Sequence, residues 1–407
     1  MYILYITYIH TYIHTSALHQ YTIASNNVAL GRCSLAENTS GSFNIALGRE
    51  ALNKNTTVIL YIAHGYRALF NNTEGNGNVA ISNRALYNNT TGNSNIALGS
   101  NSLYSNTTGY NNISIGKEAL YENTTGLSNV ALGRSALYEN TTGNYNLAIG
   151  FSALNSNTEG DHNIANGYFA LNKNTTGAFN IASGNNTLNK NTTGSDNIGI
   201  GRSVLQNNTT VNDNVAIGYL ALKNNTTGFG NVAIGEQSAA TGSNYTNSIS
   251  IGRFTSAGAS NRVRIGAGVT SIGGPAAWTN TSDARFKENI KNNVVGLDFI
   301  LGLEPVTYNI NHKAINRYQL GTDTIHSEEH YQDLYNTTNI GFLAQDVEAL
   351  ADSLNFDFHV VDKPENPEGI YGLRYAEFVP SLVKAIQEQQ KHIDQLLQRI
   401  ETLEKNK

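Results

Sequence analysis

Only 14% of the 407 residues are charged, compared with roughly 25% in an average domain, and the length allows about two or three domains. Residues 1–281 hold 14 basic and 11 acidic residues, a balance of +3, whereas residues 282–407 hold 12 and 20, a balance of −8. No proline precedes Pro275, so the composition changes in the same region and predicts the main domain boundary there. The single cysteine, Cys33, excludes an intrachain disulfide framework and is interpreted as a free thiol, because no His or Lys pairs with it at a recognisable spacing.

The N-terminal segment, residues 1–26, begins with an apolar and aromatic stretch that predicts neither a signal peptide nor a transmembrane helix. The stretch is too short to span a bilayer, and the first basic residue of the chain is Arg32. His10, His14 and His19 could be pictured as metal ligands, but the low-complexity pattern favours an unstructured or mis-started segment. We therefore expect no metal site in this segment.

Residues 27–252 form a tandem array with a period of 17 residues. The pattern Asn-Val-Ala-Leu-Gly at residues 27–31 recurs, with small variations, always at multiples of 17. A leucine recurs at 35, 52, 69, 86, 103, 120, 137, 154, 171, 188, 205 and 222, and an asparagine, usually opening Asn-Thr-Thr-Gly, at 38, 55, 72, 89, 106, 123, 140, 157, 174, 191, 208 and 225. Because neither series contains an insertion or deletion, each unit should stack on the next in one register.

Each unit is predicted to be one coil of a parallel β-roll or β-helix. Ile45 and Leu47 alternate about Ala46 with the period of a strand, and the glycine that follows and the Asn-Thr-Thr-Gly segment supply turn residues. We expect short strands at this apolar triplet and near the leucine that recurs every 17 residues, and we expect no helices. About thirteen coils at roughly 4.8 Å each would make a rod roughly 60 Å long.

The rod is predicted to be a homotrimer. Three or four apolar side chains per coil make a thin core, even if stacked Asn and Thr side chains satisfy one another along the rod. Three chains that share a core would cover the remaining apolar face and the open edges. The array resembles the head repeats of trimeric autotransporter adhesins and the repeats of phage and bacterial tail-fibre proteins, which indicates an architecture rather than a ligand.

Two repeated features of the array have competing interpretations. The Asn-x-Thr sequons would accept glycans only in a eukaryotic secretory route, and their fixed place in every coil favours a role as turn corners. Tyrosines at 87, 104, 121 and 138 form a stripe with the same period. A cell-surface glycan or receptor could bind along this stripe, but packing between chains is the interpretation that we favour.

Residues 253–281 are predicted to be a β-rich joint between the rod and the C-terminal domain. The period breaks after Gly252, strand alternation continues through Val263 and Ile265, and Pro275 and Trp278 end the rod. Gly266 and Gly268 are not interpreted as a phosphate loop, because no Gly-Lys-Ser/Thr follows them.

Residues 282–407 carry four ordered motifs followed by a heptad helix. They are Ser-Asp-Ala-Arg-Phe-Lys-Glu-Asn-Ile at 282–290, Leu-Glu-Pro-Val-Thr-Tyr at 303–308, Ile-Gly-Phe-Leu-Ala-Gln-Asp-Val at 340–347, and Tyr375. This region resembles the intramolecular chaperone auto-processing domain that caps phage endosialidases, tail spikes and neck appendages and also occurs in myelin regulatory factors. The resemblance implies a small α+β chaperone domain. Residues 316–338 match none of its motifs and are interpreted as an inserted loop.

The resemblance implies a Ser/Lys pair that cuts the chain, and these positions correspond to Ser282 and Lys287. A serine hydroxyl needs a base, and a lysine can serve when burial or a nearby cation favours its neutral form. Arg285 is a candidate for that cation, and Asn289 and Gln345 are taken as supporting residues of the same motifs. The family's cut lies at the Ser282–Asp283 bond, whereas a plain N-to-O acyl shift would break the bond before Ser282. No cofactor is expected.

The C-terminal segment, residues 377–405, is predicted to be a coiled coil. Val379, Ile386, Ile393 and Ile400 share one heptad position, and Leu382, Gln389, Leu396 and Leu403 share another. Ile and Leu at these positions favour two strands in isolation. We still expect a trimer, because the neighbouring domain and the rod can override a short coil.

The sequence as a whole predicts a fibre or tail-spike protein that trimerises, sets the register of its rod and cuts itself once at Ser282. We expect it in a virion tail fibre or at a cell surface after assembly in the cytoplasm, without nucleic-acid binding or membrane insertion. A trimeric autotransporter-type adhesin is the alternative, but it would need a signal peptide and a membrane anchor. A regulator of the myelin-factor type would need a DNA-binding domain, and the array has no basic cluster.

Overall fold

The computed structural model describes residues 17, 24–240, 244–266, 282–320, 332, 335–364 and 370–405. The chain divides into two compact units, Met1–Ala267 and Gly268–Lys407, and each is considered by itself. His10, His14 and His19 lie outside the described residues, as does most of the predicted joint after residue 266.

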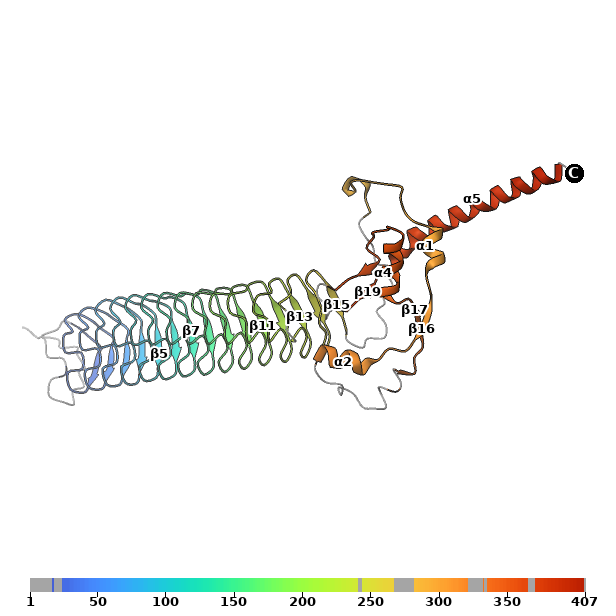
Figure 1. Cartoon of the computed structure of the whole chain (residues 1–407). Helices are drawn as coiled ribbons and strands as arrows, with labels where there is room; N and C mark the ends of the chain where they lie inside the picture. The colour runs from blue at the N-terminus through green and yellow to red at the C-terminus, as the bar shows by residue number, and fades with distance from the viewer. Residues whose placement is uncertain are drawn as a thin grey trace, which may run out of the picture. The chain divides into compact units, whose positions relative to one another are not determined.

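The first unit is a parallel β-solenoid whose strands form a single sheet in sequence order (Figure 1). Its fifteen strands of three residues define fourteen turns of the chain. They are β1 (Val28–Leu30), β2 (Ile45–Leu47), β3 (Ile62–His64), β4 (Val79–Ile81), β5 (Ile96–Leu98), β6 (Ile113–Ile115), β7 (Val130–Leu132), β8 (Leu147–Ile149), β9 (Ile164–Asn166), β10 (Ile181–Ser183), β11 (Ile198–Ile200), β12 (Val215–Ile217), β13 (Val232–Ile234), β14 (Ile249–Ile251) and β15 (Val263–Ile265).

The sheet confirms the predicted fold class and the 17-residue register. Each strand residue pairs with the residue 17 positions later, as Ile113 does with Val130. Only the last step differs, because Ile249 pairs with Val263 after a shorter coil. The strand expected near the periodic leucine is wrong, since each coil has one strand and the leucine lies in a turn. Among the described residues of this unit there is no helix.

The periodic leucines are buried in a backbone conformation that side chains other than glycine seldom adopt. All twelve, from Leu35 to Leu222, have φ between 48° and 52°. This left-handed conformation costs roughly 1–2 kcal/mol for an L-residue, and it excludes the strand that the sequence suggested. The leucines are nevertheless essentially inaccessible to solvent and, together with small inward residues such as Ala131 and Ala136, form one continuous core. The burial of each leucine offsets the strain.

Buried asparagines form two ladders along the solenoid. In the first, the Asn123 amide donates to Asn106 Oδ1 at 2.8 Å and to the Gly126 carbonyl at 3.0 Å. In the second, the Asn112 side chain donates to the Gly126 carbonyl at 2.8 Å, and its backbone N–H donates to Asn95 Oδ1 at 3.0 Å. These contacts confirm the predicted ladders and the turn-corner interpretation, because the asparagine that recurs every 17 residues in Asn-Thr-Thr-Gly is buried in the described coils.

Tyr61 replaces an asparagine in one of these ladders. It is buried and accepts a 2.8 Å hydrogen bond from Asn72 through its hydroxyl. Burial raises the pKa of the Tyr61 hydroxyl. Because the Asn72 amide turns to Tyr61, the buried Asn55 Oδ1 has no hydrogen-bond partner within the described solenoid.

The predicted tyrosine stripe is a stacked column. Its half-buried rings are nearly parallel, with centroids 5.1–5.4 Å apart, and run through Phe70, Tyr87, Tyr104, Tyr121 and Tyr138. Each ring therefore covers the face of the next. Between the two end rings, the faces are therefore occupied by neighbouring rings and the edges remain open.

The outward side of the sheet is apolar and largely exposed in the described solenoid. The middle residue of each strand from β1 to β14 is buried, whereas the first and third residues point outward, as the 39% exposure of Ile164 and the 42% exposure of Ile200 illustrate. Nearly all outward residues are Ile, Val or Leu; the exceptions are His64, Asn166 and Ser183. We call these two outward columns of β1–β15 the apolar sheet face.

The second unit is small and mixed α+β. Its elements are η1 (Ala284–Phe286), α1 (Leu297–Gly302), β16 (Val306–Tyr308), α2 (His312–Leu320), β17 (Asn339–Gly341), α4 (Ala344–Ser353), β18 (Val361–Asp362), β19 (Gly372–Leu373), η2 (Tyr375–Glu377) and α5 (Phe378–Lys405). Strands β16 and β17 pair antiparallel, as do β18 and β19. Phe299 and Phe378 lie in the core, with Val347, Ala351 and Val360. The insertion proposed from sequence begins inside α2, and most of its remainder lies outside the described residues.

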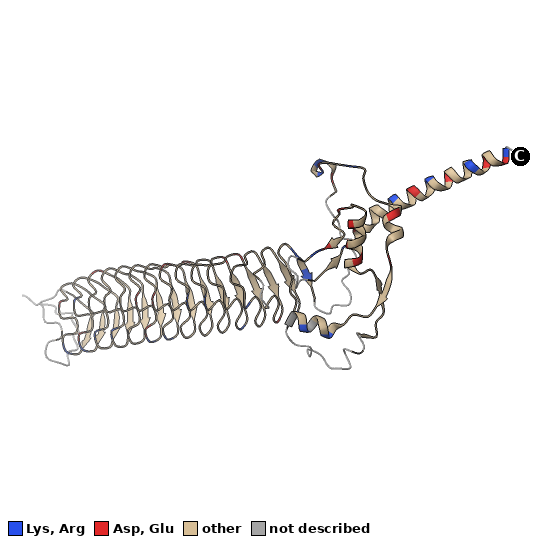
Figure 2. Cartoon of the chain, in the orientation of Figure 1, with Lys and Arg blue, Asp and Glu red and all other residues tan. Residues whose placement is uncertain are grey.

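The start of α5 packs against α1, and the rest of α5 is exposed. Leu297 N–H, in the first turn of α1, donates to Glu388 Oε2 at 2.8 Å. Gly296 allows this approach, because a Cβ there would lie 2.7 Å from the backbone nitrogen of Ala385. Farther along α5 charges are frequent (Figure 2), while Ile393 and Leu396 remain 44% and 61% exposed. The predicted helix is confirmed; its coiled-coil pairing stays a prediction.

Candidate functional site

A tight local turn brings the two predicted catalytic residues together. Asp283 caps η1 by accepting a 2.9 Å hydrogen bond from Arg285 N–H, and Lys287 N–H donates to the Ala284 carbonyl at 3.2 Å. The turn carries the Lys287 side chain back over the start of the segment. Its Nζ lies 2.8 Å from Ser282 Oγ. This distance meets the geometric requirement for a nucleophile and its base.

Arg285 interacts with Asp283 rather than with the Ser/Lys pair. Its Nη2 and Nε lie 2.6 Å and 3.0 Å from Asp283 Oδ2. Hydrogen bonds from the Arg285 side chain and then from its backbone N–H lower the pKa of the Asp283 carboxyl. The guanidinium charge is thus directed at the carboxylate of the residue that follows Ser282. The sequence-based suggestion that Arg285 acts as a cation on Lys287 has no direct contact to support it in the described part of the chain.

The segment that carries the pair is open to solvent. Ser282 and Lys287 are both exposed, and the apolar side chains of Phe286 and Ile290 are 72% and 73% exposed. A lysine base gains from burial, which disfavours the ammonium. The single chain therefore provides the hydrogen-bonded pair without the walls that would desolvate it.

The two supporting residues lie apart from the pair. Asn289 is exposed and has a positive φ of 54°, which suits an asparagine in a bend just after Lys287. Gln345 lies near the start of α4 and lines a hollow of the second unit. Within the described residues, no hydrogen bond joins either side chain to Ser282 or Lys287.

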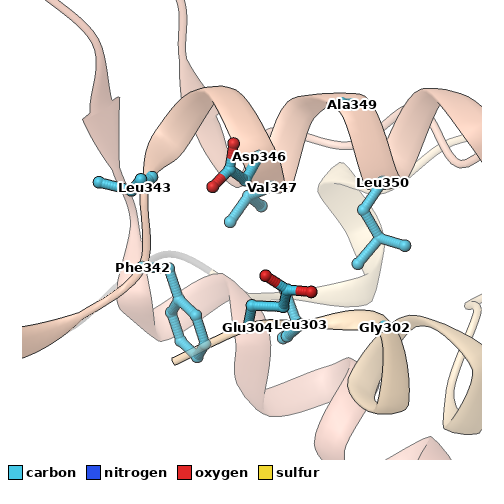
Figure 3. A pocket seen from close by; sticks show the side chains of 9 residues that line it. All are labelled: Gly302, Leu303, Glu304, Phe342, Leu343, Asp346, Val347, Ala349 and Leu350. Atoms are coloured by element: carbon cyan, nitrogen blue, oxygen red, sulfur yellow. The ribbon is translucent and has the colours of Figure 1, made fainter. Parts of the chain in front are cut away.

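Two neighbouring hollows of the second unit were not predicted from sequence. The first, about 270 Å³, lies between α4 and the segment after α1, with the carboxylates of Glu304 and Asp346 in its lining (Figure 3). The second, about 560 Å³, has no charged residue in its lining. It is formed by Tyr308, Tyr318, Phe342, Leu343, Ala344, Gln345, Ile370, Tyr371, Gly372, Leu373 and Tyr375. We call this second cavity the aromatic hollow.

Searches for other kinds of site concern only the described residues. They contain no cluster of three or more His, Cys, Asp or Glu side chains arranged to hold a metal ion. Within the same ranges, no helix combines the length and apolar character needed to cross a bilayer.

The fold defines a long parallel β-solenoid joined to a small α+β unit that ends in a helix. Residues 282–355 match the model of a peptidase family described as the chaperone of endosialidase. The match starts at the serine of the Ser/Lys pair and covers less than a fifth of the chain. A comparison with curated proteins gives no match. Together with the solenoid, the family match fits a tail spike with a C-terminal chaperone domain and supports self-cleaving activity.

Proposed function

We propose that this protein is a homotrimeric, tail-spike-like virion fibre whose C-terminal unit aligns the three chains and then cuts itself off once at Ser282. Ser282 is the nucleophile, Lys287 is the base, and residues 1–282 remain as the mature rod. The observation that carries the proposal is the 2.8 Å contact between Lys287 Nζ and Ser282 Oγ at the first residue of the family match.

Two uncovered apolar surfaces support the trimer. The apolar sheet face runs the length of the solenoid, and the heptad residues of α5, such as Ile386 at 65% exposure, face solvent. Large uncovered apolar surfaces usually mark association sites. Copies of the same chain match these surfaces, because their coils have the same spacing and their helices the same heptads.

The repetition of the rod explains why it needs a chaperone. Chains with near-identical coils can pair at many offsets of 17 residues, each about as well packed as the correct one. A non-repetitive unit that associates first would fix one offset before the slow, non-local β pairing proceeds. Release of that unit would then leave the rod kinetically trapped in its assembled state.

The reaction requires one proton carrier and no cofactor. The neutral Lys287 amine accepts the Ser282 hydroxyl proton while Oγ bonds to a peptide carbonyl carbon. The carbon–nitrogen bond of that peptide breaks, and the leaving amine takes its proton from the lysine ammonium. Water then hydrolyses the ester, which restores the Ser282 hydroxyl and releases a carboxylate.

The attacked carbonyl decides which bond is cut. Attack on the carbonyl of Thr281 breaks the bond before Ser282, whereas the family's position requires attack on the carbonyl of Ser282 itself through a smaller, more strained ring. The two outcomes differ by one serine in the mass of each fragment. The N-terminal product ends at Thr281 in the first case and at Ser282 in the second.

Intact-mass measurement of the purified full-length protein tests the proposal. Wild-type chains should appear as two fragments, whereas Ser282→Ala and Lys287→Ala should remain whole. Lys291→Ala is the matched control, because Lys291 is an exposed lysine of the same segment, and it should be cut like the wild type. Wild-type protein that is folded and trimeric but stays at full length would contradict the proposed self-cleavage. Wild-type protein that is folded but monomeric would contradict the proposed trimer.

A further inference from the structure

The carboxylate next to Ser282 is engaged on both oxygens by a single arginine. Asp283 Oδ1 accepts a hydrogen bond from Arg285 N–H at 2.9 Å. Its Oδ2 accepts hydrogen bonds from the same side chain, from Nε at 3.0 Å and from Nη2 at 2.6 Å. The guanidinium also lies over the Phe286 ring, 5.6 Å from the ring centroid. Arg285 therefore directs the Asp283 carboxylate toward itself.

This ion pair is too exposed to be explained by stability. The side chains of Arg285 and Asp283 are 80% and 35% exposed, and ion pairs as open as this contribute little to folding. The pair instead balances charge beside the Ser/Lys pair. Residues 282–291 contain two other charged groups besides Lys287, namely Glu288 and Lys291.

Lys287 faces Ser282 and no carboxylate. Its Nζ donates to Ser282 Oγ at 2.8 Å, and among the described residues no acidic side chain forms an ion pair with it. Lys287 has an extended backbone, with φ −110° and ψ 123°, so the side chain of Glu288 should point to the opposite side. Asp283, by contrast, directly follows the serine that Lys287 contacts. It is the carboxylate best placed to compete for the lysine.

We propose that Arg285 is a positioning residue of the self-cleavage, which holds the Asp283 carboxylate away from Lys287 and so leaves the amine on the serine hydroxyl. A carboxylate released from Arg285 would attract Lys287 and favour its ammonium form, which cannot accept the serine proton. Arg285 touches none of the reacting atoms and acts through Asp283. This inference rests on the proposed function and assigns a further residue to the same reaction.

The first test measures the rate of cutting in full-length variants over a range of pH. Arg285→Ala should slow the cut about tenfold at neutral pH, because an unbalanced neighbouring carboxylate favours the charged lysine by at least that factor. The rate should recover as the pH rises, because hydroxide then removes the additional proton from Lys287. Lys291→Ala is the matched control, since it removes another cation of the segment, and it should keep the wild-type rate and pH profile.

A double-mutant cycle separates action through Asp283 from direct action on Lys287. Asparagine at 283 can still accept the Arg285 N–H but carries no charge. Adding Arg285→Ala to Asp283→Asn should therefore cause little further loss of rate. Added to Glu288→Gln, the matched control, Arg285→Ala should cause the same loss as it does alone. Equal losses in the Asp283→Asn and wild-type backgrounds would overturn the proposal, because Arg285 would then act without the carboxylate.

The outcomes separate this inference from the function on which it rests. An uncut wild-type protein would contradict the proposed self-cleavage. Wild-type protein that cuts, together with an Arg285→Ala variant that cuts equally fast at every pH, would leave self-cleavage intact and overturn the role of Arg285. Size-exclusion chromatography should show the same trimer content in every variant. A rate that fell only in parallel with trimer content would also overturn the role of Arg285.

Discussion

The two units of the chain differ in whether their stabilising contacts repeat along the sequence. The solenoid satisfies nearly all of its buried polar side chains within each chain, through ladders such as Asn106–Asn123–Asn140, and packs one leucine in each of its repeated coils. These contacts repeat in every coil, so they hold the rod together but do not distinguish one alignment of chains from another. The C-terminal unit has a small core around Phe299 and much exposed apolar surface, yet none of its contacts repeats. The proposed function therefore assigns strength to the solenoid and alignment to the C-terminal unit.

The largest effect should come from the solenoid core. Leu120 is completely buried, and Leu120→Ala should lower the local free energy of unfolding by about 2–5 kcal/mol, as large-to-small core changes do. Hydrogen exchange of the flanking coils measures the change, because a repeat protein need not unfold in one step. Cutting at Ser282 should continue, and a variant that instead lost only the cut would contradict the division of roles.

A smaller effect is expected when the ladder is broken. Asn123→Ala removes the donor to Asn106 Oδ1 and to the Gly126 carbonyl, and a buried group left unpaired costs about 1–3 kcal/mol. Protection from exchange should fall in the coils on both sides. Thr125→Ala is the control, because Thr125 is exposed at the same corner, and equal effects of the two changes would argue against the ladder.

Relief of backbone strain should have a smaller effect of opposite sign. Phe43 is 55% exposed at a φ of 61°, and Phe43→Gly should stabilise its coil by about 0.5 kcal/mol, after the greater freedom of glycine in the unfolded chain is subtracted. Phe229, which is 50% exposed without a positive φ, is the control. Phe229→Gly should leave the thermal unfolding temperature unchanged or lower it. Equal stabilisation of the two variants would contradict backbone strain at Phe43.

Three carboxylates of the C-terminal unit, Asp283, Glu348 and Glu388, have lowered pKa values, and Glu388 is the one that joins α5 to α1. The hydrogen bond that the Glu388 carboxylate accepts from Leu297 N–H lowers the pKa of Glu388 in the folded state. The stabilisation is therefore present at pH values above the pKa of Glu388 in the unfolded chain, about 4.3. It is lost as the pH falls through the lower pKa of Glu388 in the folded state. Glu388→Gln should flatten this dependence in unfolding of the second unit between neutral pH and pH 3, while the solenoid is unaffected. An unchanged pH profile would show that the contact contributes nothing.

The sequence predicted the solenoid well because its information is local and repeated. The apolar triplet, the periodic asparagines and the 17-residue spacing each define a feature that the structure contains. The leucine strand was wrong because no sequence pattern announces a left-handed φ at a residue with a Cβ. The burial of each leucine in the stacked coils offsets the strain of that conformation.

The site was predictable only in part. The spacing of Ser282 and Lys287 and the surrounding motifs indicated the pair, and the structure places the two atoms within hydrogen-bond distance. The attachment of Arg285 to Asp283 was not visible, because a cation two residues from a lysine and two from an aspartate can turn either way. The hollows depend on residues from distant segments, such as Tyr308 and Ile370, so no local pattern could reveal them.

The most direct test of the central claim follows the mass and the oligomeric state of the same molecules during assembly. Size-exclusion fractions taken over time and analysed by intact mass should contain full-length chains in the monomer fractions and cut chains only in the trimer fractions. Ser282→Ala should form trimers of full-length chains. Cut monomers that appear before any trimer, or wild-type trimers that never cut, would contradict an account in which the C-terminal unit first aligns the chains and then releases them.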